Sequence, residues 1–145
     1  MKVLAALVLC LSAGAMSAEE APDAAAIRVM DEFLKAFNAK DATAWADTLL
    51  FPHVRLASGK VALYPDKASF VAAMNLEQFA AASGWAYSTW DERQVIQSSP
   101  DKVHVTTLFS RHRADGAVYE RFQSLYVIER VDGRWGVRAR SSFAP

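Results

Sequence analysis

The stretch that decides the fold covers residues 117–143 and reads AVYERFQSLYVIERVDGRWGVRARSSF. Two runs of alternating apolar and polar residues flank the pair Asp132-Gly133. An Asp-Gly pair in this setting predicts a β-hairpin with a two-residue turn, because glycine readily takes the positive φ that such a turn requires. The turn also sets the register of the two strands. We therefore expect four cross-strand pairs: Ile128 with Val137, Tyr126 with Ala139, Ser124 with Ser141, and Phe122 with Phe143.

The same period of two extends upstream of this hairpin. Residues 102–113 and 85–97 alternate in the same way, and short segments at 98–101 and at Asp115-Gly116 separate the runs. Consecutive runs of this kind, joined by turn residues, predict an antiparallel meander.

The first part of the chain has helical periodicity instead. Pro22-Asp23 can open a helix, with Asp23 as its cap. The apolar stripe that follows recurs at spacings of three and four, and it consists of Ile27, Met30, Leu34 and Phe37.

Two further helices are indicated by their caps. Asp41 can cap a second helix, and Asp66 can cap a third one that Gly84 closes. Between them, residues 53–64 alternate like a short hairpin. Helices followed by a meander predict an α+β domain, with three N-terminal helices packed on one face of a strongly curved mixed or antiparallel sheet.

The expected register sorts the sheet residues into two faces. The first face is mostly apolar and faces the helices, and the hydroxyl-bearing side chains set in it are expected to line a pocket: Thr107, Ser124, Tyr126 and Ser141. Near the open end of the same face, Arg111 and Glu120 meet across a hairpin rung, which predicts an ion pair at the rim.

The second, outer face is half apolar. It carries Leu108, Leu125 and Val127 together with His104, Arg138 and Arg140. An exposed apolar sheet face is typical of a partner-binding surface, and we expect a homodimer through it. The alternative is a solvated sheet with scattered apolar residues.

The N-terminus has the pattern of a secretory signal peptide. Lys2 is the only charge before Glu19, residues 3–11 are continuously apolar, and small residues dominate 12–18. The apolar run is too short to span a bilayer as a permanent helix, which takes roughly 20 residues. We therefore expect residues 1–18 to be removed and the protein to be exported, to a periplasm or to the medium; a buried first helix or an uncleaved anchor is the alternative.

Cleavage after Ala18 or after Ala15 both fit the pattern. A cut at the first of these leaves residues 19–23 as a short segment before a single domain at 24–145. It also removes the only cysteine and one lysine, so that 15 basic residues stand against 16 acidic ones. This near-neutral balance argues against binding to nucleic acid.

Two local stretches and the order of elements resemble the nuclear transport factor 2 superfamily, with its SnoaL-like and ketosteroid isomerase-like members. Residues 31–41, DEFLKAFNAKD, resemble the first helix of that superfamily and the break after it. Residues 131–137, VDGRWGV, resemble its closing hairpin, and the likeness covers residues 24–143. The resemblance implies a cone-shaped domain around a pocket. It does not choose a chemistry, because the same fold hosts isomerases, cyclases, dehydratases, hydrolases and binding proteins without catalysis.

No cofactor is expected. His104 and His112 lie eight residues apart on one strand, about 27 Å at the usual rise, so they cannot hold one metal ion. The six glycines are scattered and form neither a phosphate loop nor a dinucleotide fingerprint.

Acid–base chemistry in the pocket is the catalytic possibility. The resemblance implies an Asp or His that projects into the cone, with a Tyr or a protonated acid as its partner. The candidates are His53 as general base and Tyr126 as hydrogen-bond donor, with Asp47, Asp91 and Glu92 as further possibilities. The structural alternatives are a hydrogen-bonded histidine at the helix-to-strand corner and a core tyrosine.

The tryptophans could form a stacking wall for a flat ligand, or they could be core packing. Trp90 faces the cone if the turn before Lys102 has four residues. A shift of one residue in that turn would turn Trp85 and Tyr87 inward in its place. Both arrangements stay open at this point.

Two functions follow from these patterns. The first is an exported domain that binds a small, partly apolar ligand in the cone, with Trp90, Thr107, Ser124 and Ser141 as binding residues. The second is a small-molecule lyase or isomerase that uses His53 and Tyr126.

Overall fold

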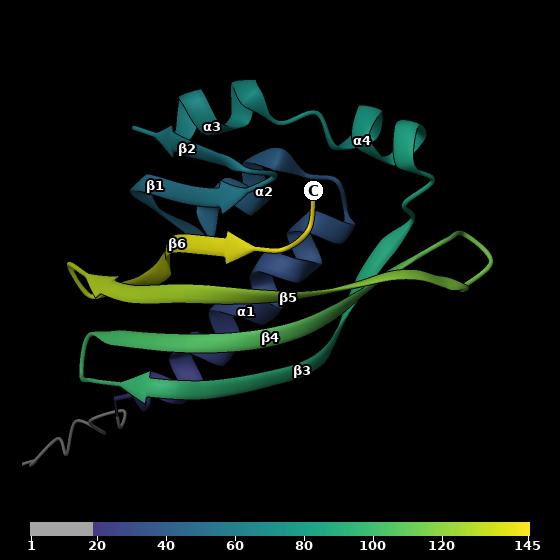
Figure 1. The fold of residues 1–145 in the computed structure, drawn as a ribbon. Coiled ribbons are helices and arrows are strands. Elements are labelled where there is room, and N and C mark those ends of the chain that lie inside the picture. Colours follow the sequence, from purple (N-terminus) through teal and green to yellow (C-terminus); the bar gives the residue numbers. More distant parts are fainter. Residues whose placement is uncertain (1–18) are drawn as a thin grey trace, which may run out of the picture.

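The computed structural model describes residues 19–145, and the predicted signal peptide lies outside this range. The chain forms helices first, then a hairpin, two more helices and four long strands (Figure 1). In order, the elements are α1 (Pro22–Asn38), α2 (Ala42–Asp47), β1 (Leu49–Ala57), β2 (Lys60–Tyr64), α3 (Lys67–Ala73), α4 (Leu76–Ser83), β3 (Tyr87–Ser98), β4 (Lys102–His112), β5 (Val118–Val131) and β6 (Arg134–Ser142).

The α+β class is confirmed, but the helices are arranged differently from the expectation. The third predicted helix is two helices, because Met74 takes an extended conformation and ends α3. Asn75 then starts α4, its side chain accepting a hydrogen bond from the backbone N–H of Gln78. Both α3 and α4 follow the first hairpin, so the helices are not all N-terminal to the sheet. That hairpin begins at Leu49 rather than at residue 53.

The six strands form one mixed sheet in the order β2-β1-β6-β5-β4-β3. Every neighbouring pair is antiparallel except β1 and β6, which are parallel. The last strand therefore lies between the first hairpin and the meander, as Figure 1 shows.

Helix α1 packs across one face of this sheet, against β3, β4 and β6. Pro22 occupies its first turn, where a missing N–H costs nothing. The prediction that Asp23 caps this helix is wrong: Asp23 lies within the first turn, where it accepts a hydrogen bond from the Ser98 hydroxyl. The buried stripe of the helix consists of Ala25, Ala26, Val29, Met30, Phe33 and Ala36.

Two turns have the chemistry that their residues predict. In Ser58-Gly59 and in Asp132-Gly133 both residues have positive φ, as a two-residue hairpin turn of type I′ requires. Ala57 consequently pairs with Lys60, and Val131 with Arg134.

The register beyond the second of these turns departs from the prediction. Ile128 pairs with Val137 as expected, but Val127 then pairs with Ala139. Arg138 is thus an extra residue on β6, and the resulting β-bulge shifts every later pair by one position.

The bulge reverses the faces of the end of β6, because side chains alternate along a strand. Tyr126 lies opposite Arg140 and Ser124 opposite Ser142, so the predicted pairs with Ala139 and Ser141 are wrong. Arg140 and Ser142 turn inward. Ser141 is exposed on the outer face.

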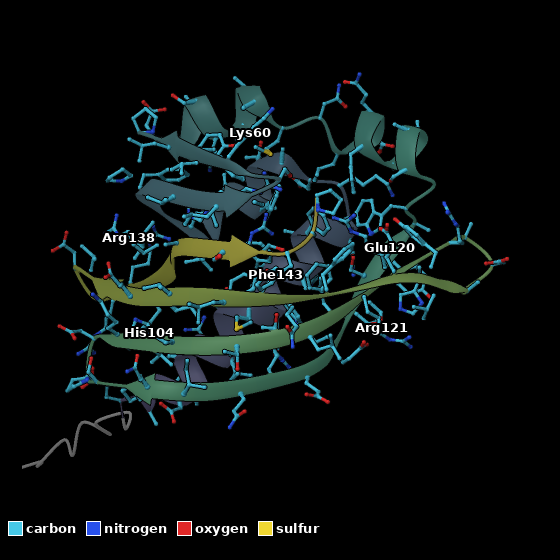
Figure 2. The ribbon with its side chains drawn as sticks, in the orientation of Figure 1. Lys60, His104, Glu120, Arg121, Arg138 and Phe143 are labelled. Atoms are coloured by element: carbon cyan, nitrogen blue, oxygen red, sulfur yellow. The ribbon has the colours of Figure 1, made fainter. Side chains whose placement is uncertain are left out.

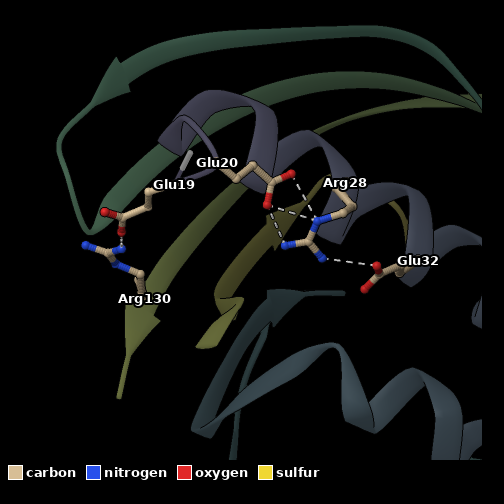
Figure 3. A network of polar contacts seen from close by, with 5 residues as sticks. All are labelled: Glu19, Glu20, Arg28, Glu32 and Arg130. Atoms are coloured by element: carbon tan, nitrogen blue, oxygen red, sulfur yellow. Dashed lines mark hydrogen bonds and ion pairs between the residues drawn. The ribbon is translucent and has the colours of Figure 1, made fainter. Parts of the chain in front are cut away.

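The start of the described chain is held by ion pairs at the surface (Figure 3). Arg28 binds Glu20 at 2.9 Å and Glu32 at 3.1 Å, and Arg130 of β5 pairs with Glu19. Exposed pairs of this kind contribute little each, about 0–1 kcal/mol. Their effect is to orient residues 19 and 20 against α1 and β5. Within residues 19–145, no helix is both long and apolar enough to cross a membrane.

Candidate functional site

A cavity of about 250 Å³ lies between the sheet, α1 and α4. Its walls are mainly aromatic, because α1 presents one face of its stripe there and the meander contributes its inward side chains. The aromatic lining consists of Phe33, Phe37, Trp45, Phe79, Trp90 and Phe109, with Tyr126 at the sheet wall.

Three arginines also line this cavity. Arg55 comes from β1, Arg111 from β4 and Arg140 from β6. Ser88, Asn75 and Ser142 add polar side chains, and Ala144 and Pro145 at the end of the chain also line the cavity. No carboxylate side chain belongs to the lining among the residues that the structure describes.

Arg55 and Arg140 lie side by side in the sheet. They are register partners in the parallel β1–β6 pair, and Arg140 is in turn the partner of Tyr126. One rung of the sheet thus presents two guanidinium side chains and a phenol to the cavity, with neighbouring strands about 4.8 Å apart. Like charges directly opposite each other are unfavourable in a sheet, so packing alone gives no reason for this arrangement.

The positive charge of Arg111 is only partly balanced by a neighbouring carboxylate. It is 7% exposed, and its guanidinium lies 3.4 Å from the carboxylate of Glu120, a side chain that reaches the solvent. This confirms the predicted pair across the rung. Phe79 and Phe122 flank the guanidinium carbon at 5.1 and 4.9 Å from their ring centres. Its Nε is buried and makes no hydrogen bond within residues 19–145.

Arg140 has no carboxylate partner in the part of the chain that the structure describes. Its guanidinium carbon lies 5.7 Å from the ring centre of Phe33 and 5.9 Å from that of Trp45, and its Nε is buried without a hydrogen bond. A charged donor withdrawn from water without an acceptor is unfavourable.

The protonation equilibria of the rung reflect this enclosure. Burial lowers the pKa of Arg55, and the positive charges of Arg140 and Arg111 lower it further. Burial raises the pKa of Tyr126, while Arg140 opposes that rise. An anion in the cavity would relieve both the burial penalty and the repulsion between the arginines.

His53 lies elsewhere. It is 3% exposed, and its Nδ1 is 3.0 Å from the carbonyl oxygen of Val137. A carbonyl can only accept, so Nδ1 carries the proton. The ring stacks on Tyr64 and meets Phe70 edge-on, and burial lowers the pKa of His53 to about 4. His53 is not among the residues that line the cavity, whereas Tyr126 is, so the structure does not bring these two candidates together there.

The predicted hydroxyl lining is also revised. Thr107 and Ser124 are buried on the inward face, as expected, but neither reaches the cavity. Ser124 donates to the Ser142 hydroxyl at 2.9 Å, and it is Ser142 that lines the cavity, whereas Ser141 points outward because of the bulge.

Trp90 and Trp85 both face inward. The two alternatives considered for this strand, an inward Trp90 or an inward Trp85, are therefore not mutually exclusive. Trp90 lines the cavity and meets Tyr126 edge-on at 5.6 Å. Trp85 precedes β3 and packs against Phe37, and its indole N–H donates to the Ser88 hydroxyl at 2.9 Å. Bulges after Trp90 and Val95 break the strict alternation on which the prediction relied.

The remaining acid candidates lie outside the cavity. Asp47 pairs with Lys67 at the surface, and Asp91 accepts from Ser110 and pairs with Arg121 at 3.3 Å. Glu92 is exposed. Across residues 19–145, no three His, Cys, Asp or Glu side chains are grouped as a metal ion would need.

Sequence reasoning therefore missed the arginines. Arg140 was expected on the outer face, Arg111 only at the rim, and Arg55 was not singled out. The alternation of β1 could have indicated Arg55, which has the same parity as His53 and Ala57, but the bulge that turns Arg140 inward has no comparable local signal.

The architecture and the enclosed cavity define an α+β cone of the NTF2-like class, and solved structures agree. An NTF2-like protein with a cystatin-like fold from Novosphingobium aromaticivorans matches with a TM-score of 0.67 and 12% identity, over 83% of this chain and 79% of that one. A ketosteroid isomerase-like protein from Erwinia carotovora atroseptica matches with a TM-score of 0.60 and 20% identity, over 84% and 96%. A protein of unknown function from Nostoc punctiforme matches with a TM-score of 0.66 and 10% identity, over 83% and 89%. At such identities the likeness shows the fold alone.

Residues 21–142 match the family described as NTF2-like protein (DUF6841), and the chain belongs to that family. The resemblance noted in the sequence is thereby confirmed. No curated protein matches the chain.

Proposed function

We propose that this protein is an exported binding protein, which holds a small ligand with an apolar body in the cone cavity. The observation that carries the proposal is the cavity itself: about 250 Å³, lined by aromatic rings and a few inward polar groups. Cavities that bind small molecules have this composition, in which apolar walls supply affinity and the polar groups supply orientation.

The ionisable lining favours binding over acid–base turnover. The ionisable side chains in it are three arginines and Tyr126. A guanidinium stays protonated in proteins, and burial moves the pKa of Tyr126 upward, away from neutrality. A general base works best when its pKa lies near the working pH.

Export and dimerisation are part of the proposal. Export rests on the signal-peptide pattern of residues 1–18. Dimerisation rests on the outer sheet face, where Leu108, Leu125 and Val127 are only half-buried and Phe143 is 80% exposed; Figure 2 labels Phe143 on this side. Fractionation of the source cells tests the first, and light scattering after size exclusion tests the second.

Native mass spectrometry of protein purified from its source, without denaturation, tests ligand binding. We expect a retained small molecule, lost in Trp90→Ala, which removes one aromatic wall. Trp135→Ala is the matched control, because Trp135 is also half-buried but packs against Arg130 outside the cavity. Equal retention in both variants, or an empty wild-type protein that binds no aromatic probe, would contradict the proposal.

A further inference from the structure

Two of the three arginines that line the cavity have no anionic partner among the described residues. Within residues 19–145, neither Arg55 nor Arg140 forms an ion pair with a carboxylate, and the Arg140 side chain makes its polar contact with the Tyr126 hydroxyl. Of the other arginines, Arg113 and Arg134 donate to backbone carbonyl oxygens, and the rest each pair with a carboxylate. Within residues 19–145, Arg55 and Arg140 are thus the arginines with neither a carboxylate nor a backbone carbonyl as partner, and they neighbour each other on one rung of the cavity wall.

Two of these arginines also have a buried N–H donor without an acceptor. The Nε atoms of Arg140 and Arg111 are buried without an acceptor. In native proteins most buried polar atoms find a partner, so donors left over at a cavity point to a partner that occupies it. Guanidinium groups present parallel N–H donors in the geometry that a carboxylate accepts.

The walls define the rest of the ligand. Trp90 and Tyr126 stand edge-on at 5.6 Å, Phe109 stands edge-on to Trp90 at 6.3 Å, and all three rings line the cavity together with the arginine rung. A cavity of about 250 Å³ suits a compact body of one or two rings rather than a long chain.

We propose that the cavity selects a small aromatic carboxylate, whose carboxylate is held by Arg55 and Arg140, with Arg111 as a third cation in the lining, and whose ring lies against Trp90. The inference rests on the proposed function and names its ligand class. The repulsion between two neighbouring arginines makes the empty site unfavourable, and a carboxylate turns that repulsion into attraction.

Calorimetric titration with 2-naphthoate and its neutral analogue 2-naphthamide tests this selectivity, because the two molecules differ in charge and hardly in shape. We expect 2-naphthoate to bind at least about tenfold more tightly at neutral pH, as charge-assisted hydrogen bonds allow. Added salt should weaken only the naphthoate.

Variants locate the anion site. Arg140→Gln and Arg55→Gln should each lower the naphthoate affinity about tenfold and lower the naphthamide affinity much less, so that retained naphthamide binding shows that the cavity still folds. Arg121→Gln is the control, because it removes the same charge from an exposed residue that pairs with Asp91 outside the cavity.

The outcomes separate this inference from the proposed function. Equal binding of the two probes would overturn the anion inference and leave the binding function standing. Binding of neither probe would overturn both. Displacement of naphthoate by an equal concentration of inorganic phosphate would also overturn the inference, because the aromatic walls would then contribute nothing.

Discussion

Arg140 of β6 lies directly opposite Tyr126 of β5, one position away from the partner that the Asp132-Gly133 turn alone would select. The extra residue Arg138 causes this shift, and it places a cation inside the cone where regular alternation would have placed it outside. The chemistry of the cavity thus depends on a single β-bulge.

The first prediction concerns the stability cost of that cation. Arg140→Met should raise the free energy of unfolding by about 1 kcal/mol, because an apolar side chain replaces a charged one that has no carboxylate partner in residues 19–145. Urea unfolding measures this. Arg138→Met is the control and should be destabilised, since Arg138 binds Glu129 at 2.9 Å and donates to the Pro52 carbonyl at 3.1 Å. A loss above about 2 kcal/mol in Arg140→Met would show that the fold needs the charge.

The second prediction concerns His53 and pH. The folded protein holds the pKa of His53 at about 4, below its usual value of 6.5, so the unfolded chain binds this proton first. The stabilisation is complete above pH 6.5 and is lost as the pH falls toward 4, by at most about 3 kcal/mol. Urea unfolding between pH 7 and 5 should show this slope in the wild type and in His104→Gln, and should lack it in His53→Phe. A signal of His53 that titrates near pH 6.5 in NMR spectra would refute the assignment.

The third prediction concerns Tyr126. Burial raises its pKa above the usual value of 10, so this phenol should ionise only when the pH rises well above 10. Absorbance near 295 nm follows the titration, and the difference between wild type and Tyr126→Phe isolates the one group. Ionisation at or below pH 10 in the difference spectrum would contradict the burial of the Tyr126 hydroxyl.

The fourth prediction concerns a polar clasp between α1 and β3. The Asn38 side chain donates to the Ser88 carbonyl at 2.9 Å and accepts from the Ser88 N–H at 2.8 Å. Asn38→Ala leaves the backbone N–H and C=O of Ser88 without these partners and should lower the free energy of unfolding by about 1–3 kcal/mol. Asn75→Ala, which removes one helix cap, should cost about 1 kcal/mol. Thermal and urea unfolding compare the two, and a smaller loss at Asn38 than at Asn75 would contradict the clasp.

Local chemistry made much of the fold predictable. Asp132-Gly133 and Ser58-Gly59 specify their turns through positive φ, and Asp41 and Asp66 cap the helices that follow them. These signals act over a few residues, and for that reason they can be read without a structure.

The site was less predictable because its residues depend on longer-range geometry. Tyr126 and Trp90 were found from strand parity and do line the cavity. His53 was misplaced because its hydrogen bond to Val137 exists only once β6 lies beside β1. Arg140 was missed because tertiary pairing, rather than a local motif, positions the bulge at Arg138.

The parallel contact between β1 and β6 also has a consequence for how the chain folds. The hairpin of β1 and β2 joins the sheet only through β6, the strand that comes last in chain order. Leu49 therefore cannot reach its register partner Val137 until β6 is in place, and the sheet that walls the cavity cannot be completed from the N-terminal half of the chain. Because such distant pairings slow folding, assembly of this domain should be a late, all-or-none event in which the binding site and the sheet become complete together.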